Sequence, residues 1–187
     1  MAHTGSSTTK LIVLRGNSGS GKSSAAMAVR KRLGRTAALI EQDYFRRIVL
    51  KEADVPDGAN IGLISTTARY ALDHGYDVIL EGILSARRYA EMLGALRDDH
   101  LGESVFYYFE VSLEETLRRH QTRSKASEFS AEDMRGWYRP RDLLPVVLER
   151  RVAEESTLTE TVSRILNEVY PGLSTESRGS ADGTIRR

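Results

Sequence analysis

The chain has 187 residues, of which 40% are hydrophobic and 28% are charged, and its formal net charge is +1. This length and composition are those of one globular domain with a sizeable core. The near-neutral charge gives no reason to expect nucleic acid or a membrane surface as a partner. The lack of cysteine excludes disulfides, thiolate metal sites and cysteine nucleophiles. No apolar run resembles a signal peptide or a membrane span, so we expect a soluble, cytoplasmic protein.

The first half of the chain alternates between apolar runs and segments of helical period. It is predicted to begin with a buried strand and a helix that Gly34 ends. A second strand, a short helix, a loop, a longer helix and a third strand follow. In order, these segments are residues 11–14, 21–33, 36–43, 44–51, 52–59, 60–75 and 76–82. Asn60 is expected to cap the longer helix, because its side chain can accept a backbone N–H bond.

The second half continues the alternation and then becomes less regular. A helix beginning at Ser85 precedes a fourth strand at residues 104–111. The next segment, SLEE at residues 112–115, has the spacing of a capping box and predicts another helix. Residues 124–142 are polar and have no settled period. A last short strand near residues 149–152 and a helix from 157 to 169, begun by the capping pattern TLTE, complete the domain.

Strands that alternate with helices predict an α/β fold. We expect a three-layer sandwich in which a central parallel sheet of about five strands is covered by helices on both faces. One domain is predicted over residues 10–170, with residues 1–9 and 171–187 disordered because they are small and polar.

The loop after the first strand carries the clearest chemical signal. Residues 16–23 read GNSGSGKS and fit the phosphate-loop pattern G-x-x-x-x-G-K-[ST], with a strand before and a helix after. Glycines let backbone N–H groups approach an anion, and the helix N-terminus adds further donors. Lys22 can reach the β- and γ-phosphates, and the Ser23 hydroxyl can bind Mg²⁺. The residues predicted to bind a nucleoside triphosphate are Gly16, Asn17, Ser18, Gly19, Ser20, Gly21, Lys22, Ser23 and Ser24.

Several classes of phosphate-loop protein carry motifs that this sequence lacks. No asparagine is followed by the Lys-x-Asp of GTP-binding switches, and there is no L-S-G-G-Q signature of ABC proteins. The acidic string that follows an apolar strand in helicases and AAA machines is also missing. On these residues the chain resembles the small-molecule P-loop kinases, in the broad group of chloramphenicol phosphotransferase, gluconate kinase, shikimate kinase and adenylylsulfate kinase. The resemblance covers about residues 10–170.

This resemblance implies two acids at the ends of strands. Asp43 ends the second predicted strand and is the candidate catalytic carboxylate, because a carboxylate there can accept a proton from the attacking hydroxyl. Asp43 could equally cap the helix that begins at Tyr44. Glu81 ends the third strand, where it would support Mg²⁺ or the acceptor, and Gly82 would let a ligand approach. Which of the two acids is the base stays open.

The resemblance also implies an arginine-bearing lid, here residues 124–142. Arg119 and Arg123 lie four residues apart near a helix end and could cover the γ-phosphoryl group from one face. Cations that complement a helix C-terminus are the alternative interpretation. Tyr44 and Arg47 could line the acceptor pocket, although solvation at the surface also accounts for Arg47.

The sequence therefore favours an ATP- and Mg²⁺-dependent phosphotransferase. Its expected acceptor is a hydroxyl of a small molecule: an antibiotic or other metabolite, a sugar or a nucleoside. A polynucleotide 5′-hydroxyl kinase or a zeta-toxin-like sugar-nucleotide kinase is one alternative. A non-catalytic nucleotide-binding regulatory module, which would keep Lys22 without needing Asp43, is another. The sequence is compatible with a monomer or a homodimer, and with ATP or another nucleoside triphosphate.

Overall fold

The computed structural model describes residues 3–121 and 130–172 and contains one five-stranded sheet. All of its strand pairs are parallel, and the strand order is β2-β3-β1-β4-β5. The predicted parallel sheet of about five strands is thereby confirmed. The strands are β1 (Lys10–Gly16), β2 (Ala37–Glu41), β3 (Asp77–Gly82), β4 (Glu103–Glu110) and β5 (Glu149–Ala153).

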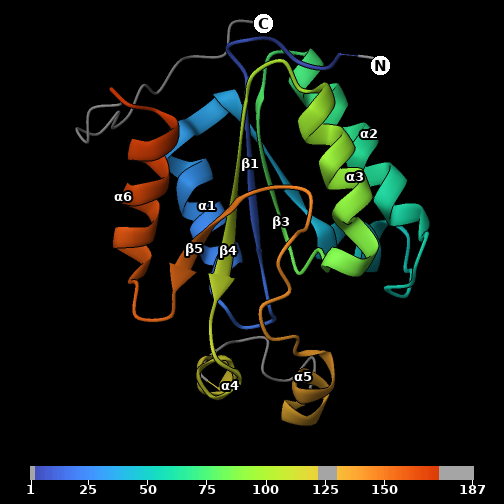
Figure 1. Ribbon diagram of the computed structural model, residues 1–187, viewed down its shortest axis with the longest axis vertical. Helices are drawn as coiled ribbons and strands as arrows, with labels where there is room; N and C mark the ends of the chain where they lie inside the picture. Colours follow the sequence, from blue (N-terminus) through green and yellow to red (C-terminus); the bar gives the residue numbers. More distant parts are fainter. Residues whose placement is uncertain (1–2, 122–129, 173–187) are drawn as a thin grey trace, which may run out of the picture.

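Helices cover both faces of the sheet, as Figure 1 shows. On one face lie α1 (Lys22–Leu33) and α6 (Leu158–Val169), and on the other lie α2 (Ala59–Asp73) and α3 (Ala86–Asp99). Successive residues of β1 point alternately into the two cores: Ile12 packs with α1 and α6, and Val13 packs with α2 and α3. A strand buried on both faces needs apolar residues at every position, which is why β1 reads as a continuous apolar run.

The carboxyl ends of the strands point toward α4 (Leu113–Gln121) and α5 (Ala131–Trp137), which lie beyond the edge of the sheet in Figure 1. The chain crosses from β1 over β3 to β2 and later returns to place β4 on the other side of β1. Such a reversal of strand order opens a crevice at the carboxyl ends of the strands, where ligands bind in open α/β sheets. The topology therefore directs the search for a site to the end of β1.

Two of the capping predictions are wrong. Asn60 lies inside α2, whose N-cap is Gly58; its amide donates to Glu52 Oε2 at 2.7 Å and accepts from the Tyr89 hydroxyl at 2.7 Å. At residues 112–115, Ser112 Oγ accepts from the backbone N–H of Glu115, but the Glu115 carboxylate does not return the bond. It binds arginines of the next turn instead, because charge-assisted bonds outcompete a neutral amide. The capping box at residues 157–160 is confirmed.

The expectation of a disordered start is wrong for residues 3–9. The Thr4 backbone N–H donates to the Asp99 carbonyl at 2.9 Å, and Thr4 forms a β-bridge with His100. The carboxylate of Asp73 accepts from both Thr4 Oγ1 (2.8 Å) and the Gly5 N–H (2.7 Å). These polar partners hold a segment that has little apolar side chain of its own.

Residues 122–129 and 173–187, which include the first part of the predicted lid and most of the predicted tail, lie outside the described residues. Between them, residues 131–137 form the short helix α5, capped by a Ser130–Asp133 capping box. Among the helices of residues 3–121 and 130–172, none is long and apolar enough to cross a bilayer.

Candidate active site

The phosphate loop joins β1 to α1 in a path that only glycine permits at several points. Gly16, Gly19 and Gly21 have φ values of 151°, 84° and 100°. A Cβ atom on Gly16 would lie 2.9 Å from the Phe109 carbonyl oxygen, and one on Gly19 would lie 2.8 Å from the Thr116 carbonyl oxygen. The loop is thus enclosed by β4 and α4, and side chains at these positions would displace it.

Lys22 and Ser20 turn polar groups toward the interior of this loop. Lys22 is 8% exposed, and its Nζ donates to the Asn17 carbonyl at 3.4 Å. The Ser20 N–H donates to the same carbonyl at 3.2 Å. In the described part of the chain, the buried Ser20 hydroxyl has no hydrogen-bond partner. A buried hydroxyl in this position needs an external acceptor such as a phosphate oxygen, because an unsatisfied polar group costs free energy.

Ser23 and Glu81, the predicted metal ligands, are in direct contact. Ser23 Oγ donates to Glu81 Oε2 at 3.0 Å, and Glu81 is 4% exposed. Pairing of β1 with β3 sets Glu81 opposite Leu14, two residues before the phosphate loop begins at Gly16. Burial raises the pKa of the Glu81 carboxyl; nearby Lys22 and the bond from Ser23 oppose this rise. Beside the loop, therefore, Glu81 has a carboxyl group whose ionised form is unfavourable unless a cation lies next to it.

Ser23 and Glu81 fit Mg²⁺ that is shared with a nucleotide better than they fit a metal ion whose ligands all come from the protein. In residues 3–121 and 130–172 no group of three His, Asp or Glu side chains could hold a metal ion. Mg²⁺ commonly takes one or two protein oxygens and completes its octahedron with waters and substrate phosphates. A hydroxyl and a carboxylate at the mouth of a phosphate loop match that ligand set.

Gly82 leaves room for the side chain of Gln42. A Cβ atom there would lie 2.4 Å from Gln42 Oε1. The Gln42 amide crosses this space to donate to the Tyr89 hydroxyl at 2.7 Å and to accept from the Leu84 N–H at 3.0 Å. The space that a side chain at Gly82 would need is therefore filled by Gln42, and the approach of a ligand to Gly82 stays a prediction.

Asp43 and Arg47 lie together beside the phosphate loop, and Tyr44 does not join them. Asp43 stands at the N-cap of the following helical turn, η2 (Tyr44–Val49), but its side chain forms no capping hydrogen bond. Its carboxylate is 57% exposed and accepts from Arg46 Nη2 at 3.2 Å. A cavity of about 540 Å³, here called the Asp43 cavity, is lined by Asp43, Arg47 and Ser18 of the loop, among others. Tyr44 is exposed and does not line it.

Arg119 reaches the opposite side of the loop. Its guanidinium donates to the Ser20 carbonyl at 3.0 Å, to the Glu154 carbonyl at 2.6 Å and to Glu115 Oε1 at 2.6 Å. Arg119 thus lies against the phosphate loop, and its expected role of covering the γ-phosphoryl group stays a prediction. Arg123 lies outside the described residues.

A second cavity, of about 310 Å³, lies on the Arg119 side of the loop and is here called the Arg119 cavity. Its lining combines the start of α1, the end of β4 and the connection from β5 to α6. That connection was missed by sequence reasoning, because polar residues between a strand and a helix look like any turn. The lining residues include Ser20, Gly21, Ser24, Phe109, Arg119, Ser156 and Thr157.

Arg15 is the second feature that sequence reasoning missed. It is fully buried on β1 and donates to both carboxylate oxygens of Glu149 at 2.8 and 2.9 Å. It also donates twice to the Leu84 carbonyl, at 2.9 and 2.7 Å, and once to Asp142 at 3.3 Å. The available signal was a cation inside an otherwise apolar strand. Such a residue must be paired, because an isolated buried charge is too costly.

Asn17 of the phosphate loop holds the chain that follows α5. Its amide donates to the Arg139 carbonyl at 2.8 Å, and its oxygen accepts from the Arg139 N–H at 2.9 Å. Three residues later, Asp142 accepts from Arg15 and from the Ala86 N–H. The return of the predicted lid is thus fastened to the loop and to the start of α3.

Comparison with known proteins identifies the family and the fold. The family model described as "AAA domain" matches residues 11–140. The family match holds although the chain lacks the acidic string that is expected of AAA machines, so that lack does not exclude this family. A search of curated proteins gave no match.

Among solved structures, the fold matches kinases over nearly the whole chain. An APS kinase from Mycobacterium tuberculosis, solved with AMPPNP and APS, aligns with a TM-score of 0.65 at 20% identity, covering 88% of this chain and 97% of that one. A gluconokinase from Sinorhizobium meliloti 1021 aligns with a TM-score of 0.61 at 22% identity, covering 90% and 93%. A sugar kinase from Janibacter sp. HTCC2649 gives 0.63 at 17%, covering 90% and 99%. The chain thus has the P-loop kinase fold that its sequence resemblance predicted, and it belongs to the AAA domain family.

Proposed function

We propose that this protein transfers the γ-phosphoryl group of ATP to a hydroxyl of a small molecule. The observation that carries the proposal is the phosphate loop with one cavity on each side, the Asp43 cavity and the Arg119 cavity. A kinase needs two substrates that meet at the γ-phosphate, whereas a nucleotide-sensing module needs room for only one. The kinase names of the proteins that share this fold agree with the proposal.

The nucleotide is assigned to the loop and the Arg119 cavity. Backbone N–H groups of residues 17–23 and the Lys22 ammonium would bind the phosphates, and the partnerless Ser20 hydroxyl would donate to one of their oxygens. The Arg119 cavity continues from Gly21 and Ser24 toward the β5–α6 connection, which leaves room for the nucleoside. Arg119, already against the loop, would place positive charge beside the triphosphate.

Ser23 and Glu81 are assigned to Mg²⁺. When bound, the ion neutralises charge on the β- and γ-phosphates. Ser23 offers its hydroxyl as a ligand, and the Glu81 carboxylate holds the ion or its waters. This role accounts for a carboxylate that burial makes costly to ionise in the protein alone.

Asp43 is assigned to the acceptor. Its exposed carboxylate faces the Asp43 cavity, and the bond from Arg46 orients it. It would accept the proton of the acceptor hydroxyl while the new O–Pγ bond forms. The bond between Pγ and the bridging oxygen breaks, and ADP leaves with that electron pair.

The test uses purified protein, Mg²⁺ and γ-labelled ATP with sugars, nucleosides and antibiotics as acceptors. Label should move to an organic product. Lys22→Ala should lower kcat/KM by about 100-fold or more, because it removes a preorganised cation from the phosphates. Lys31→Ala, at the exposed far end of α1, is the matched control and should leave the rate unchanged.

Asp43→Asn separates the proposal from a binding module. It should keep ATP affinity and lower transfer by about 10²–10⁴-fold, the usual contribution of a general base. Label found only in inorganic phosphate with every acceptor, or an Asp43→Asn protein with full activity, would contradict the proposal. ATP binding without any transfer, with an affinity for ATP that Asp43→Asn does not change, would instead indicate a regulatory module.

A further inference from the structure

The lining of the Asp43 cavity carries a net positive charge. Five arginines and three aspartates line it, which leaves an excess of two positive charges in a chain whose net charge is only +1. These residues come from η2 and the chain on either side of it, from the start of α3 and from the chain around α5. They are Arg46, Arg47, Arg87, Arg88 and Arg139, with Asp43, Asp54 and Asp142.

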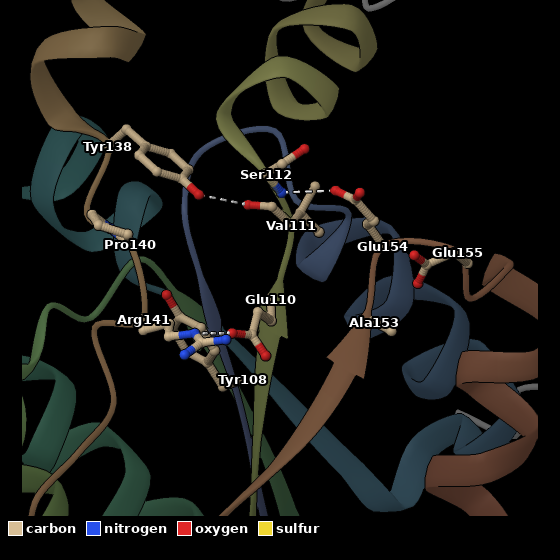
Figure 2. A pocket seen from close by; sticks show the side chains of 10 residues that line it. All are labelled: Tyr108, Glu110, Val111, Ser112, Tyr138, Pro140, Arg141, Ala153, Glu154 and Glu155. Atoms are coloured by element: carbon tan, nitrogen blue, oxygen red, sulfur yellow. Dashed lines mark hydrogen bonds and ion pairs between the residues drawn. The ribbon is translucent and has the colours of Figure 1, made fainter.

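A neighbouring cavity at the same edge of the sheet has the opposite charge. It has a volume of about 400 Å³ and lies between the ends of β4 and β5 and the chain after α5 (Figure 2). Glu110, Glu154 and Glu155 line it against the single cation Arg141, whose Nε donates to Glu110 at 2.8 Å. The positive charge is therefore concentrated on the side of the phosphate loop where Asp43 lies.

Pairing inside the Asp43 cavity does not remove the excess. Arg46 binds Asp43 at 3.2 Å, and Arg88 binds Asp54 at 2.6 Å. Asp142 is bound from outside the cavity lining by the buried Arg15. Each aspartate thus has a cationic partner, and the lining keeps its excess of two positive charges however the individual pairs are arranged.

Unsatisfied donors point to the same conclusion. In the described residues, four buried side-chain polar atoms have no hydrogen-bond partner. One is Ser20 Oγ of the phosphate loop; the other three, Arg46 Nε, Arg88 Nε and Ser85 Oγ, belong to residues that line the Asp43 cavity. All three atoms can donate, so the wall of the Asp43 cavity holds more hydrogen-bond donors than the described part of the protein satisfies.

We propose that the acceptor is an anion: a hydroxyl compound that carries a phosphate, sulfate or carboxylate group. The anionic group would bind between η2 and the start of α3, at Arg47 and Arg87, and its hydroxyl would lie at Asp43. Arginine suits this role because its planar fork binds such groups through two parallel hydrogen bonds. This inference rests on the proposed function and narrows its acceptor class.

A binding experiment tests the charge requirement directly. The protein is first saturated with Mg²⁺ and AMPPNP so that the phosphate loop is occupied, and it is then titrated with sodium sulfate, glycerol 3-phosphate and glycerol. Sulfate and glycerol 3-phosphate should bind saturably, and glycerol should not. Arg47→Gln and Arg87→Gln should each weaken binding of the two anions by about tenfold, the loss of one charge-assisted pair.

Arg97→Gln is the matched control, because it removes the same charge from the other end of α3, away from the cavity lining. It should leave the affinity for both anions unchanged. Equal binding of glycerol and glycerol 3-phosphate, no saturable sulfate binding, or equal effects of Arg97→Gln and Arg87→Gln would each overturn the inference.

A kinetic experiment separates this inference from the proposed function. Transfer from γ-labelled ATP is compared for D-gluconate against D-glucitol, glycerol 3-phosphate against glycerol, and adenosine 5′-monophosphate against adenosine. Label should enter only anionic members, and Arg47→Gln and Arg87→Gln should raise the acceptor KM about tenfold with the KM for ATP unchanged. Transfer to neutral members alone overturns the inference and leaves the proposed function standing. Failure to bind AMPPNP overturns the proposed function first.

Discussion

At the scale of single residues, Glu81 shows how the site and the stability of the fold oppose each other. The side chain is 4% exposed, and burial is the largest influence that raises its pKa. Lys22 and Ser23 favour the ionised form without cancelling that effect. A carboxylate kept under these conditions stabilises the protein less than a neutral side chain of the same shape would.

Glu81→Gln should therefore raise stability and lower activity. We expect a gain of about 1 kcal/mol at pH 7, or about 2–4 °C in Tm for a protein of this size. Glutamine can still accept the bond from Ser23, whereas it is a poor partner for Mg²⁺ and its waters. Thermal unfolding and the Mg²⁺ dependence of transfer measure the two effects.

The pH dependence of that gain has a definite sign. The folded pKa of Glu81 is raised, so ionisation destabilises the fold as the pH rises through that value, and protonation removes the penalty below it. The difference in Tm between Glu81→Gln and the unmodified protein should shrink as the pH falls from 7 toward 4.5. A difference that grows in acid would contradict this interpretation.

At the scale of elements, the buried Arg15 joins parts of the chain that are far apart in sequence. Its guanidinium connects β1 to the start of β5 through Glu149, to the chain after β3 through Leu84, and to the chain after α5 through Asp142. Asn17 makes a further connection from the loop to Arg139. The guanidinium of Arg15 and the side-chain amide of Asn17 thus hold Asp142 and Arg139, two residues that line the Asp43 cavity.

Arg15→Met should cost about 3–5 kcal/mol of unfolding free energy, because Glu149 is left buried without its cation. Denaturant unfolding measures the loss. The double variant Arg15→Met/Glu149→Leu should recover more than half of it, since it removes the orphaned charge as well. A single variant that loses less than about 1 kcal/mol would show that Glu149 finds another partner.

At the scale of the whole molecule, the two ends of the sheet have separate tasks. The phosphate loop and its cavities lie at the carboxyl ends of the strands, near α4 and α5 in Figure 1. The segment of residues 3–9 lies at the other end, where Asp73 binds Thr4 and Gly5 and where Thr9 Oγ1 contacts His100 Nε2 at 3.0 Å. Changes there should affect stability and leave catalysis alone.

Asp73→Asn should lower Tm by about 1–3 °C without changing kcat or KM. The two hydrogen bonds from the N-terminal segment lower the pKa of the Asp73 carboxyl, and an exposed group of this kind contributes about 0.5–1 kcal/mol. Because the pKa is lowered, this contribution is present above the ordinary aspartate value and is lost as the pH falls through the folded one. The difference in Tm between Asp73→Asn and the unmodified protein should therefore be present at pH 7 and shrink as the pH falls toward 3; a difference that stays constant would contradict the assignment.

The sequence by itself determined the elements whose signal is local. The strand cores and the glycine loop could be predicted, since a strand buried on both faces must be apolar throughout and a backbone that holds phosphates must lack side chains. The order of strands and helices was enough to bring Lys22, Ser23, Asp43 and Glu81 to one edge, because the carboxyl ends of parallel strands meet there.

Only the tertiary structure decided what fills the space around those residues. Gln42 fills the space beside Gly82, and Arg15 is buried in the interior. The side chain of Asn60 forms hydrogen bonds with Glu52 and Tyr89 and does not cap α2. Only the tertiary structure decides the sign of the charge in each cavity as well, because the arginines of η2, α3 and the chain around α5 come together only after the chain folds. Contacts such as Gln42 with Leu84, 42 positions apart, and Arg15 with Glu149, 134 positions apart, leave no periodic trace in the sequence. Each is set by the packing of whole layers and not by neighbours along the chain.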